Sequence, residues 1–219
     1  MADPGTRHPR FERLEPTLRQ RILDAALREF GRFGYGAASM NRLVEGAGIS
    51  KGALFKYFGT KAGLFEHVYR STMEEVKTLL RSVRDQTAGE PFFARLERVL
   101  RAGLEFTTSR PLSAAIYYRV IYTGDAPHGN RILAEVQDSS RRFLRGLVVE
   151  GVRTGDLRAD LDPDRTSFIL QSVLDRFLQA QYLEFMALSS GGPSDPSTAP
   201  DQWISHIVGL FRDGLVKRP

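Results

Sequence analysis

Residues 39–58 contain two short helix signals separated by a glycine, and this spacing constrains the fold more than any other feature. Ser39 and Ser50 are both good N-cap residues, because each hydroxyl can accept a hydrogen bond from an unsatisfied amide of the first helical turn. Residues 40–47 between them suffice for about two helical turns. Gly48 can then adopt the positive φ that ends a helix. The pattern predicts a helix-turn-helix motif whose second helix starts at Ser50.

The net charge of the chain lies entirely in the segment that holds this motif. Residues 1–70 contain 12 Lys or Arg and 7 Asp or Glu, whereas the two classes balance over residues 71–219. A cationic face is what neutralisation of DNA phosphates and release of counterions require. Basic residues that merely solvate an N-terminal tail would give a similar asymmetry, but its coincidence with the motif favours DNA binding.

Composition excludes several other classes of protein. The chain has 219 residues, enough for one large core or two modest ones, and its hydrophobic (42%) and charged (26%) fractions are those of an ordinary globular protein. It has no cysteine, which excludes a disulfide scaffold, a cysteine-ligated zinc site and thiol catalysis. The first residues lack the apolar core of a signal peptide, and the most apolar window, residues 168–188, is interrupted by charges. These features indicate a protein of the reducing cytoplasm.

Apolar residues recur at the helical period along most of the chain, and no alternating strand pattern is present in the sequence. The spacing predicts a helix over residues 16–33 that Gly34 ends, and a long helix that starts near Thr60. A last helix is expected from about Asp201. We therefore predict an all-α fold.

The expected helices divide the chain into three regions. Residues 1–15, rich in proline and arginine, are predicted to be a disordered basic tail. Residues 16–62 form the expected DNA-binding domain, and residues 63–219 a second helical domain. Two interpretations of the tail arginines stay open, since they could reach a minor groove or simply remain solvated.

Six short motifs make residues 16–69 resemble the TetR/AcrR family of transcriptional regulators. They are Ile22-Leu-Asp-Ala-Ala, Phe30-Gly-Arg-Phe-Gly-Tyr35, Ala47-Gly-Ile-Ser50, Gly52-Ala-Leu-Phe, Tyr57-Phe58 and Lys61-Ala-Gly-Leu64. The rest of the chain matches the family only in length and helical layout. Two positions depart from the family pattern, which often has Tyr where Phe55 stands and Thr where Ala38 stands.

The resemblance implies a fold of about nine helices, three of them in the DNA-binding unit. It also implies a homodimer that binds a palindromic operator and represses a nearby gene. A small ligand, bound in the C-terminal domain, would release the DNA.

The second helix of the motif should lie in the major groove with its first residues at base edges. The predicted base-reading residues are Lys51, Gly52, Ala53, Phe55 and Lys56. Lys51 can donate to guanine, while the small Gly52 and Ala53 allow close approach of the backbone. The predicted phosphate contacts are Ser39, Arg42, Tyr57 and Lys61. The alternatives are that Phe55 faces only the protein and that Lys51, Lys56 and Tyr57 are merely exposed.

The C-terminal region is less informative. Six residues are candidates for an effector pocket, because aromatic and polar side chains mix there: Phe106, Tyr118, Tyr122, Phe143, Gln171 and Phe177. A plain helical core would have the same composition. Five residues on the last two apolar helices are candidates for a dimer interface: Leu174, Leu178, Tyr182, Ile207 and Phe211.

Three other functions compete with this interpretation. An enzyme is disfavoured because the four histidines lack metal-ligand spacing and no nucleophile-elbow motif is present, so we expect neither metal nor cofactor. A helical interaction module without DNA binding is disfavoured by Lys51, Tyr57 and Lys61. A transcriptional activator of the same fold is not excluded by the sequence.

Overall fold

A computed structural model describes residues 8–127, 129–182 and 199–215 of the chain. Within these ranges it contains ten helices and no strand, so the predicted all-α class is confirmed. The predicted count of about nine helices differs only by α1, a single turn. None of the described helices is both long and apolar enough to cross a membrane.

The chain forms two compact units, each made of two segments. Unit 1 comprises residues 1–74 and 112–132, and unit 2 comprises residues 75–111 and 133–219. Unit 1 holds α1 (Pro9–Glu12), α2 (Pro16–Ala37), α3 (Met40–Ala47), α4 (Lys51–Phe58), the first half of α5 (Lys61–Gln86) and nearly all of α7 (Pro111–Thr123). Unit 2 holds the rest of α5, α6 (Phe92–Ser109), most of α8 (Gly129–Thr154), α9 (Pro163–Tyr182) and α10 (Pro200–Leu215). The sequence-based boundary after residue 62 does not coincide with this division, which assigns α7 to unit 1.

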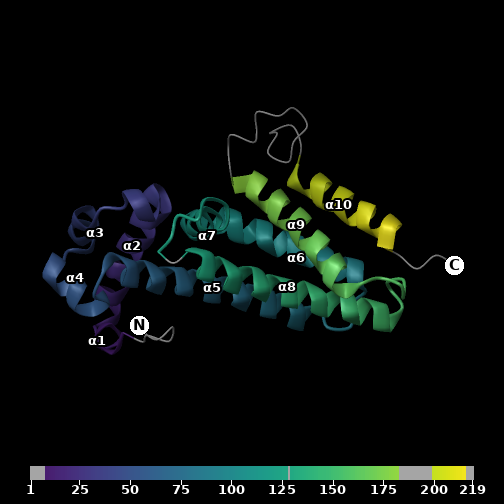
Figure 1. Cartoon of the computed structure of the whole chain (residues 1–219), viewed down its shortest axis with the longest axis horizontal. Helices are drawn as coiled ribbons and strands as arrows, with labels where there is room; N and C mark the ends of the chain where they lie inside the picture. Colours follow the sequence, from purple (N-terminus) through teal and green to yellow (C-terminus); the bar gives the residue numbers. More distant parts are fainter. Residues whose placement is uncertain (1–7, 128, 183–198, 216–219) are drawn as a thin grey trace. The chain divides into compact units, whose positions relative to one another are not determined.

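The core of unit 1 is built on α2, which packs against α3 and, through the rings of Phe30 and Phe65, against α5 (Figure 1). Ile22, Phe30, Leu43, Leu54 and Leu64 are all fully buried there. Glu15 caps α2 by accepting hydrogen bonds from the N–H groups of residues 17 and 18. The expected end of this helix at Gly34 is found as a break, since Gly34 has φ of 74° and ψ of 176° inside the segment assigned to α2.

Residues 8–15, assigned by the sequence analysis to a disordered tail, are instead packed on unit 1. Phe11 of α1 is 1% exposed, and its ring centroid lies 4.7 Å from that of Phe58 and 5.2 Å from that of His67. His8 joins the same ring cluster, 5.3 Å from His67. Burial, followed by the neighbouring His8, lowers the pKa of His67. The polar composition of residues 1–15 did not indicate that Phe11 is buried. Burial of its ring stabilises the short helix α1.

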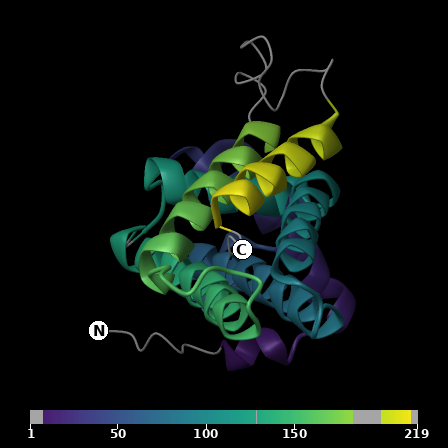
Figure 2. The same ribbon diagram turned by 90° about the vertical axis from the view of Figure 1, so that its right-hand side faces the viewer.

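The core of unit 2 lies where α9 and α10 pack on α6, and α9 and α10 run side by side in both views (Figures 1 and 2). Leu96, Leu100, Val148, Leu170 and Ile204 are fully buried in it. Helices of this kind obtain most of their stability from such an apolar face rather than from propensity.

Candidate DNA interface

The α3–α4 motif has the geometry that its sequence predicts. The Ser39 hydroxyl accepts a hydrogen bond from the N–H of Arg42 at 3.4 Å, and the Ser50 hydroxyl accepts one from the N–H of Ala53 at 3.1 Å. Gly48 ends α3 with φ of 67°, in the left-handed region that glycine favours. Two caps and one glycine therefore fix where each helix of the motif begins and ends.

Helix α4 has one buried face and one exposed face. Leu54 and Phe58 are 0% and 5% exposed and anchor the helix in unit 1. All five predicted base-reading residues retain exposure: Lys51, Gly52 and Lys56 are exposed, and Ala53 and Phe55 are partly buried. A Cβ added at Gly52 would have no neighbour within 4 Å, so a large ligand could approach the backbone there.

A buried carboxylate that the sequence analysis did not identify organises the predicted phosphate contacts Ser39 and Arg42. Glu29 of α2 is 6% exposed and accepts hydrogen bonds from the N–H of Ser39 at 2.6 Å and from Nη2 of Arg42 at 2.5 Å. Burial raises the pKa of Glu29, but the hydrogen bonds from Arg42 and Ser39 outweigh it and hold the pKa below its ordinary value. The sequence contained an indication that Glu29 is buried, since this residue interrupts the apolar stripe of residues 22–33.

The two predicted phosphate cations lie over aromatic rings at the end of α2. The guanidinium of Arg42 lies 4.3 Å from the ring centroid of Phe33, and its side chain is 51% exposed. The ammonium of Lys61 lies 4.9 Å from the ring centroid of Tyr35 and donates to the carbonyl of Gly36 at 3.2 Å. Because an ammonium has three donors, Lys61 keeps two that can bind a phosphate.

Tyr57, the fourth predicted phosphate contact, is partly buried on α4. Its ring centroid lies 6.3 Å from that of Phe11, so α1 packs behind the end of the predicted recognition helix. The structure thus keeps all four predicted phosphate contacts in unit 1, on α4, at the start of α5, and at the cap and first turn of α3.

The six candidate pocket residues are divided between the two units. Tyr118 and Tyr122 belong to unit 1, where their rings stack 6.2 Å apart, while the other four belong to unit 2. Phe177 is 3% exposed inside the core of unit 2, and Phe143 packs against that core. Of the six, only Gln171 lines one of the pockets described below.

Gln171 lies in a groove of about 270 Å³ between α8 and α9. Asp138, Phe168 and Asp175 line the same groove. Burial raises the pKa of Asp175 to about 6, although a hydrogen bond from Gln171 opposes the shift. The groove combines an aromatic ring, an amide and a desolvated carboxyl group, which are typical elements of a small-molecule site.

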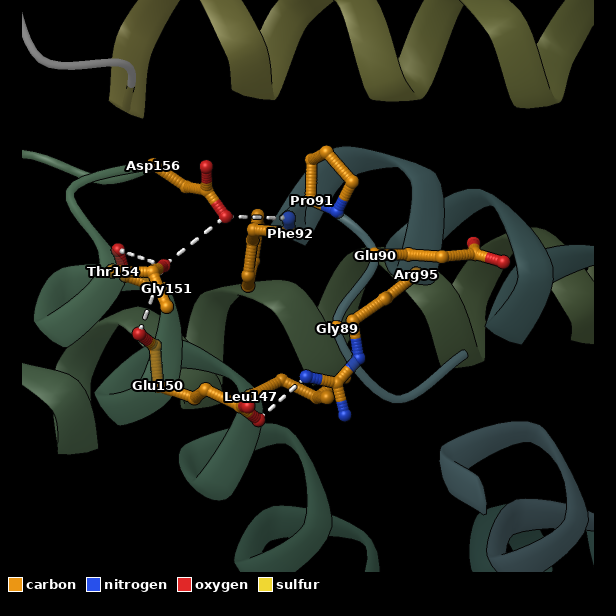
Figure 3. Close-up of a pocket in the computed structure, with 10 residues that line it drawn as sticks. All are labelled: Gly89, Glu90, Pro91, Phe92, Arg95, Leu147, Glu150, Gly151, Thr154 and Asp156. Carbon is orange, nitrogen blue, oxygen red and sulfur yellow. Dashed lines mark hydrogen bonds and ion pairs between the residues drawn. The ribbon is translucent and has the colours of Figure 1, made fainter. Parts of the chain in front are cut away.

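A second, smaller pocket of about 140 Å³ in unit 2 is lined by residues that hydrogen-bond to one another (Figure 3). Arg95, 5% exposed, donates to Oε2 of Glu150 at 2.5 Å, and the two side chains point toward each other. Asp156 accepts a hydrogen bond from the N–H of Phe92 at 3.0 Å and so caps α6, which its N-cap Pro91 does not. In the parts of the chain that the structure describes, no group of three or more His, Cys, Asp or Glu residues could hold a metal ion.

Two of the predicted dimer contacts are already buried within the single chain. Leu174 and Ile207 are 5% and 7% exposed and belong to the core of unit 2. Leu178 and Phe211 are partly buried against the same core, and the side chain of Tyr182 lies outside the described residues. The apolar residues of α9 and α10 that led us to predict a dimer surface thus mostly face the core of unit 2.

Different residues of α9 and α10 are apolar and exposed. Phe168, Ile169 and Leu210 are 64%, 54% and 62% exposed. Sequence periodicity could not separate them from their buried neighbours, because both sets lie on strongly apolar helices.

Comparison with known proteins identifies the family that this architecture represents. Residues 22–68 match the bacterial regulatory proteins of the tetR family, and residues 90–195 match the tetracyclin repressor-like C-terminal domain. The chain therefore belongs to the tetR family of transcriptional regulators, as its motifs predicted.

Particular relatives share most of the chain. The HTH-type transcriptional repressor Rv1474c of Mycobacterium tuberculosis is 31% identical over 172 residues, which cover 71% of this chain and 90% of that protein. A TetR family regulator from Chloroflexus aurantiacus, solved by crystallography, is 26% identical with a TM-score of 0.69, covering 96% of this chain and 98% of its own. FadR of Bacillus subtilis in complex with stearoyl-CoA has a TM-score of 0.71 at 14% identity, covering 89% and 98%, and shares the fold alone. All three proteins are transcriptional regulators.

Proposed function

We propose that the protein is a homodimeric transcriptional repressor that binds a palindromic DNA operator and is released by a small-molecule effector. The observation that carries the proposal is the exposed face of α4, where Lys51, Gly52 and Lys56 stand free of the core that Leu54 and Phe58 anchor. An α-helix presented in this way fits the major groove, and its first residues reach base edges.

The surroundings of α4 support phosphate binding. Arg42 and Lys61 are cations held over aromatic rings, and Ser39 caps α3 beside them. Phosphate contacts fix the register of a protein on DNA, while contacts from α4 would provide sequence preference. The local positive charge of residues 1–70 would add the salt-dependent part of the affinity.

The exposed residues of α9 and α10 support dimerisation. Pairing of Phe168, Ile169 and Leu210 with a second copy would remove three large apolar side chains from water. The partly buried Leu178 and Phe211 would add contacts at the edge of that surface. A symmetric dimer would place two recognition helices about one DNA turn, roughly 34 Å, apart.

We propose that the effector binds in the groove between α8 and α9. The protein would act in the cytoplasm. Its volume of about 270 Å³ admits a small organic molecule. Gln171 and Asp175 would provide polar anchors, and Phe168 an aromatic wall.

Fluorescence-anisotropy titration against the duplex upstream of the protein's own gene, at several salt concentrations, tests the proposal. A scrambled duplex is the control. Tight binding that prefers the native duplex and weakens with salt is the expected result. Equal, weak binding to both duplexes would place the operator elsewhere. Absence of binding even at low salt would contradict DNA binding and favour a helical interaction module instead.

Repression and activation are separated by a reporter assay. Deletion of the gene should raise expression from the bound promoter if the protein is a repressor. A fall in expression would identify an activator with the same DNA interface.

A further inference from the structure

At the end of α2, two backbone N–H groups donate hydrogen bonds to one carboxylate, that of Asp125 in the loop after α7. Oδ2 of Asp125 accepts a hydrogen bond from the N–H of Tyr35 at 2.9 Å, and Oδ1 accepts one from the N–H of Gly36 at 2.9 Å. Gly34 permits this close approach, because a Cβ at that position would clash with Oδ2. Two successive amides are therefore bound by the two oxygens of one side chain.

The loop that carries this carboxylate is itself ordered by local contacts in unit 1. The N–H of Asp125 donates to the hydroxyl of Thr123 at 3.3 Å, and Gly124 has φ of 63°. Arg119 of α7 donates to the carbonyl of Arg32 at 3.3 Å, so α7 contacts the same end of α2 a second time. Asp125 is thus held in place rather than free to turn away.

The carbonyl side of the same α2 segment holds the two predicted phosphate cations. Nζ of Lys61 donates to the carbonyl of Gly36 at 3.2 Å. Nη2 of Arg42 donates to the carbonyl of Ala37 at 3.3 Å. Gly36 therefore donates to Asp125 through its N–H and accepts from Lys61 through its carbonyl, so that one residue connects the two side chains.

We propose that Asp125 is a positioning residue for DNA binding, which fixes the segment 34–37 and through it the places of Lys61 and Arg42. The inference rests on the proposed function, since it requires these cations to contact phosphates. Asp125 itself carries negative charge and does not contact DNA in this proposal.

The charge of Asp125 makes the proposal sharply testable. A negative charge near DNA repels phosphates, so its removal alone should tighten binding or leave it unchanged. Removal of a positioning side chain has the opposite effect, because Lys61 and Arg42 then bind phosphates less well. The direction of the change therefore separates the two roles.

The loop that carries Asp125 precedes a helix that belongs to both units. It leads into α8, which starts at Gly129 in unit 1 and continues in unit 2 from Leu133. Asp125 therefore lies in the segment of the chain between α7 and a helix that the two units share.

The experiment compares Asp125→Ala with the parent protein in anisotropy titrations on the duplex upstream of its own gene. We expect binding about tenfold weaker, with the slope of log affinity against log salt reduced by about 0.9 for each phosphate that is no longer neutralised. Asp160→Ala is the matched control, because Asp160 is also a loop aspartate, with a side chain that is 76% exposed. The control should bind DNA as the parent does.

A double-mutant cycle tests whether Asp125 acts through Lys61. In a Lys61→Ala background, Asp125→Ala should cost less than in the parent, because the ammonium that Asp125 positions is already absent. Circular dichroism and thermal unfolding check that each variant folds. Asp125→Asn, which retains one acceptor oxygen, provides a milder variant in which an intermediate weakening is expected.

Three outcomes would overturn the inference. Asp125→Ala could bind DNA as tightly as the parent, or more tightly, without a reduced salt slope. The effects of Asp125→Ala and Lys61→Ala could multiply independently. A parent protein that binds no DNA at low salt would overturn the proposed function itself, and this result is distinct because it appears before any variant is compared.

Discussion

The α3–α4 motif and the α9–α10 pair differ in how their functional residues are specified. In the motif, local signals decide which residues are exposed: two serine caps, one left-handed glycine and the buried Leu54 and Phe58. On α9 and α10, apolar residues occur on several sides, and packing on α6 decides which of them face the core. A recognition helix can thus be found from sequence spacing, whereas a dimer or effector surface depends on what the neighbouring helices cover.

The largest test of this comparison uses two phenylalanines of α9. Phe177 is 3% exposed and Phe168 is 64% exposed. Phe177→Ala should lower the free energy of unfolding by about 3 to 5 kcal/mol, because it opens a cavity in the core of unit 2. Phe168→Ala should leave the fold nearly as stable and instead weaken dimerisation. Urea unfolding and sedimentation measure the two effects; similar losses of stability would show that the two faces are not distinct.

A second test compares one glycine from each unit. Gly34→Ala combines a positive φ with a clash against Asp125, so we expect a decrease of about 3 kcal/mol in the free energy of unfolding. Gly146, in α8, has no atom within 4 Å of an added Cβ. Gly146→Ala should therefore stabilise the protein by about 0.5 to 1 kcal/mol. Equal changes in the free energy of unfolding of the two variants, measured by urea titration, would mean that the backbone conformation of Gly34 does not restrict which residue can stand there.

A third test separates two lysines within the DNA interface. Lys61→Ala should weaken binding to all duplexes and flatten the salt slope, because one phosphate is no longer neutralised. Lys51→Ala should instead relax preference at one base pair, by about 1 to 3 kcal/mol. Anisotropy titrations against single-base variants of the duplex measure both. If the two variants behave alike, the assignment of base and phosphate roles is wrong.

The smallest expected effect concerns pH and Asp175. Burial raises its pKa from 3.8 to about 6, so the folded protein binds the proton more tightly than the unfolded chain. This contribution to stability is complete below pH 3.8 and is lost as the pH rises through about 6. Asp175→Asn should therefore be more stable than the parent at pH 8, by about 1 to 2 kcal/mol, with the difference disappearing near pH 4.

Urea unfolding of Asp175→Asn and the parent across this pH range checks the prediction. Asp138→Asn is the control, since Asp138 is more exposed and forms ion pairs with Arg141 and Arg142. A difference between Asp175→Asn and the parent that does not vary with pH would show that the Asp175 carboxyl is not desolvated in solution.

Individual residues show where prediction from the sequence stops. Gly34 and Gly48 were identified as helix ends, because the required backbone conformation is a local property. Phe11 was missed, because a single aromatic residue in a polar tail gives no periodic signal. Asp125 was missed for a different reason: its partners Tyr35 and Gly36 lie about ninety residues away in the chain.

The sequence by itself determined the all-α class, the position of the helix-turn-helix motif and the charge that favours DNA. These depend on caps, glycines and periodicity, which act over a few residues. Only the tertiary structure decided that Glu29 orders Ser39 and Arg42, that Asp125 holds the end of α2, and that Leu174 is core while Phe168 is surface. The reason is physical, since burial and hydrogen-bond partners across helices depend on packing between segments distant in the chain.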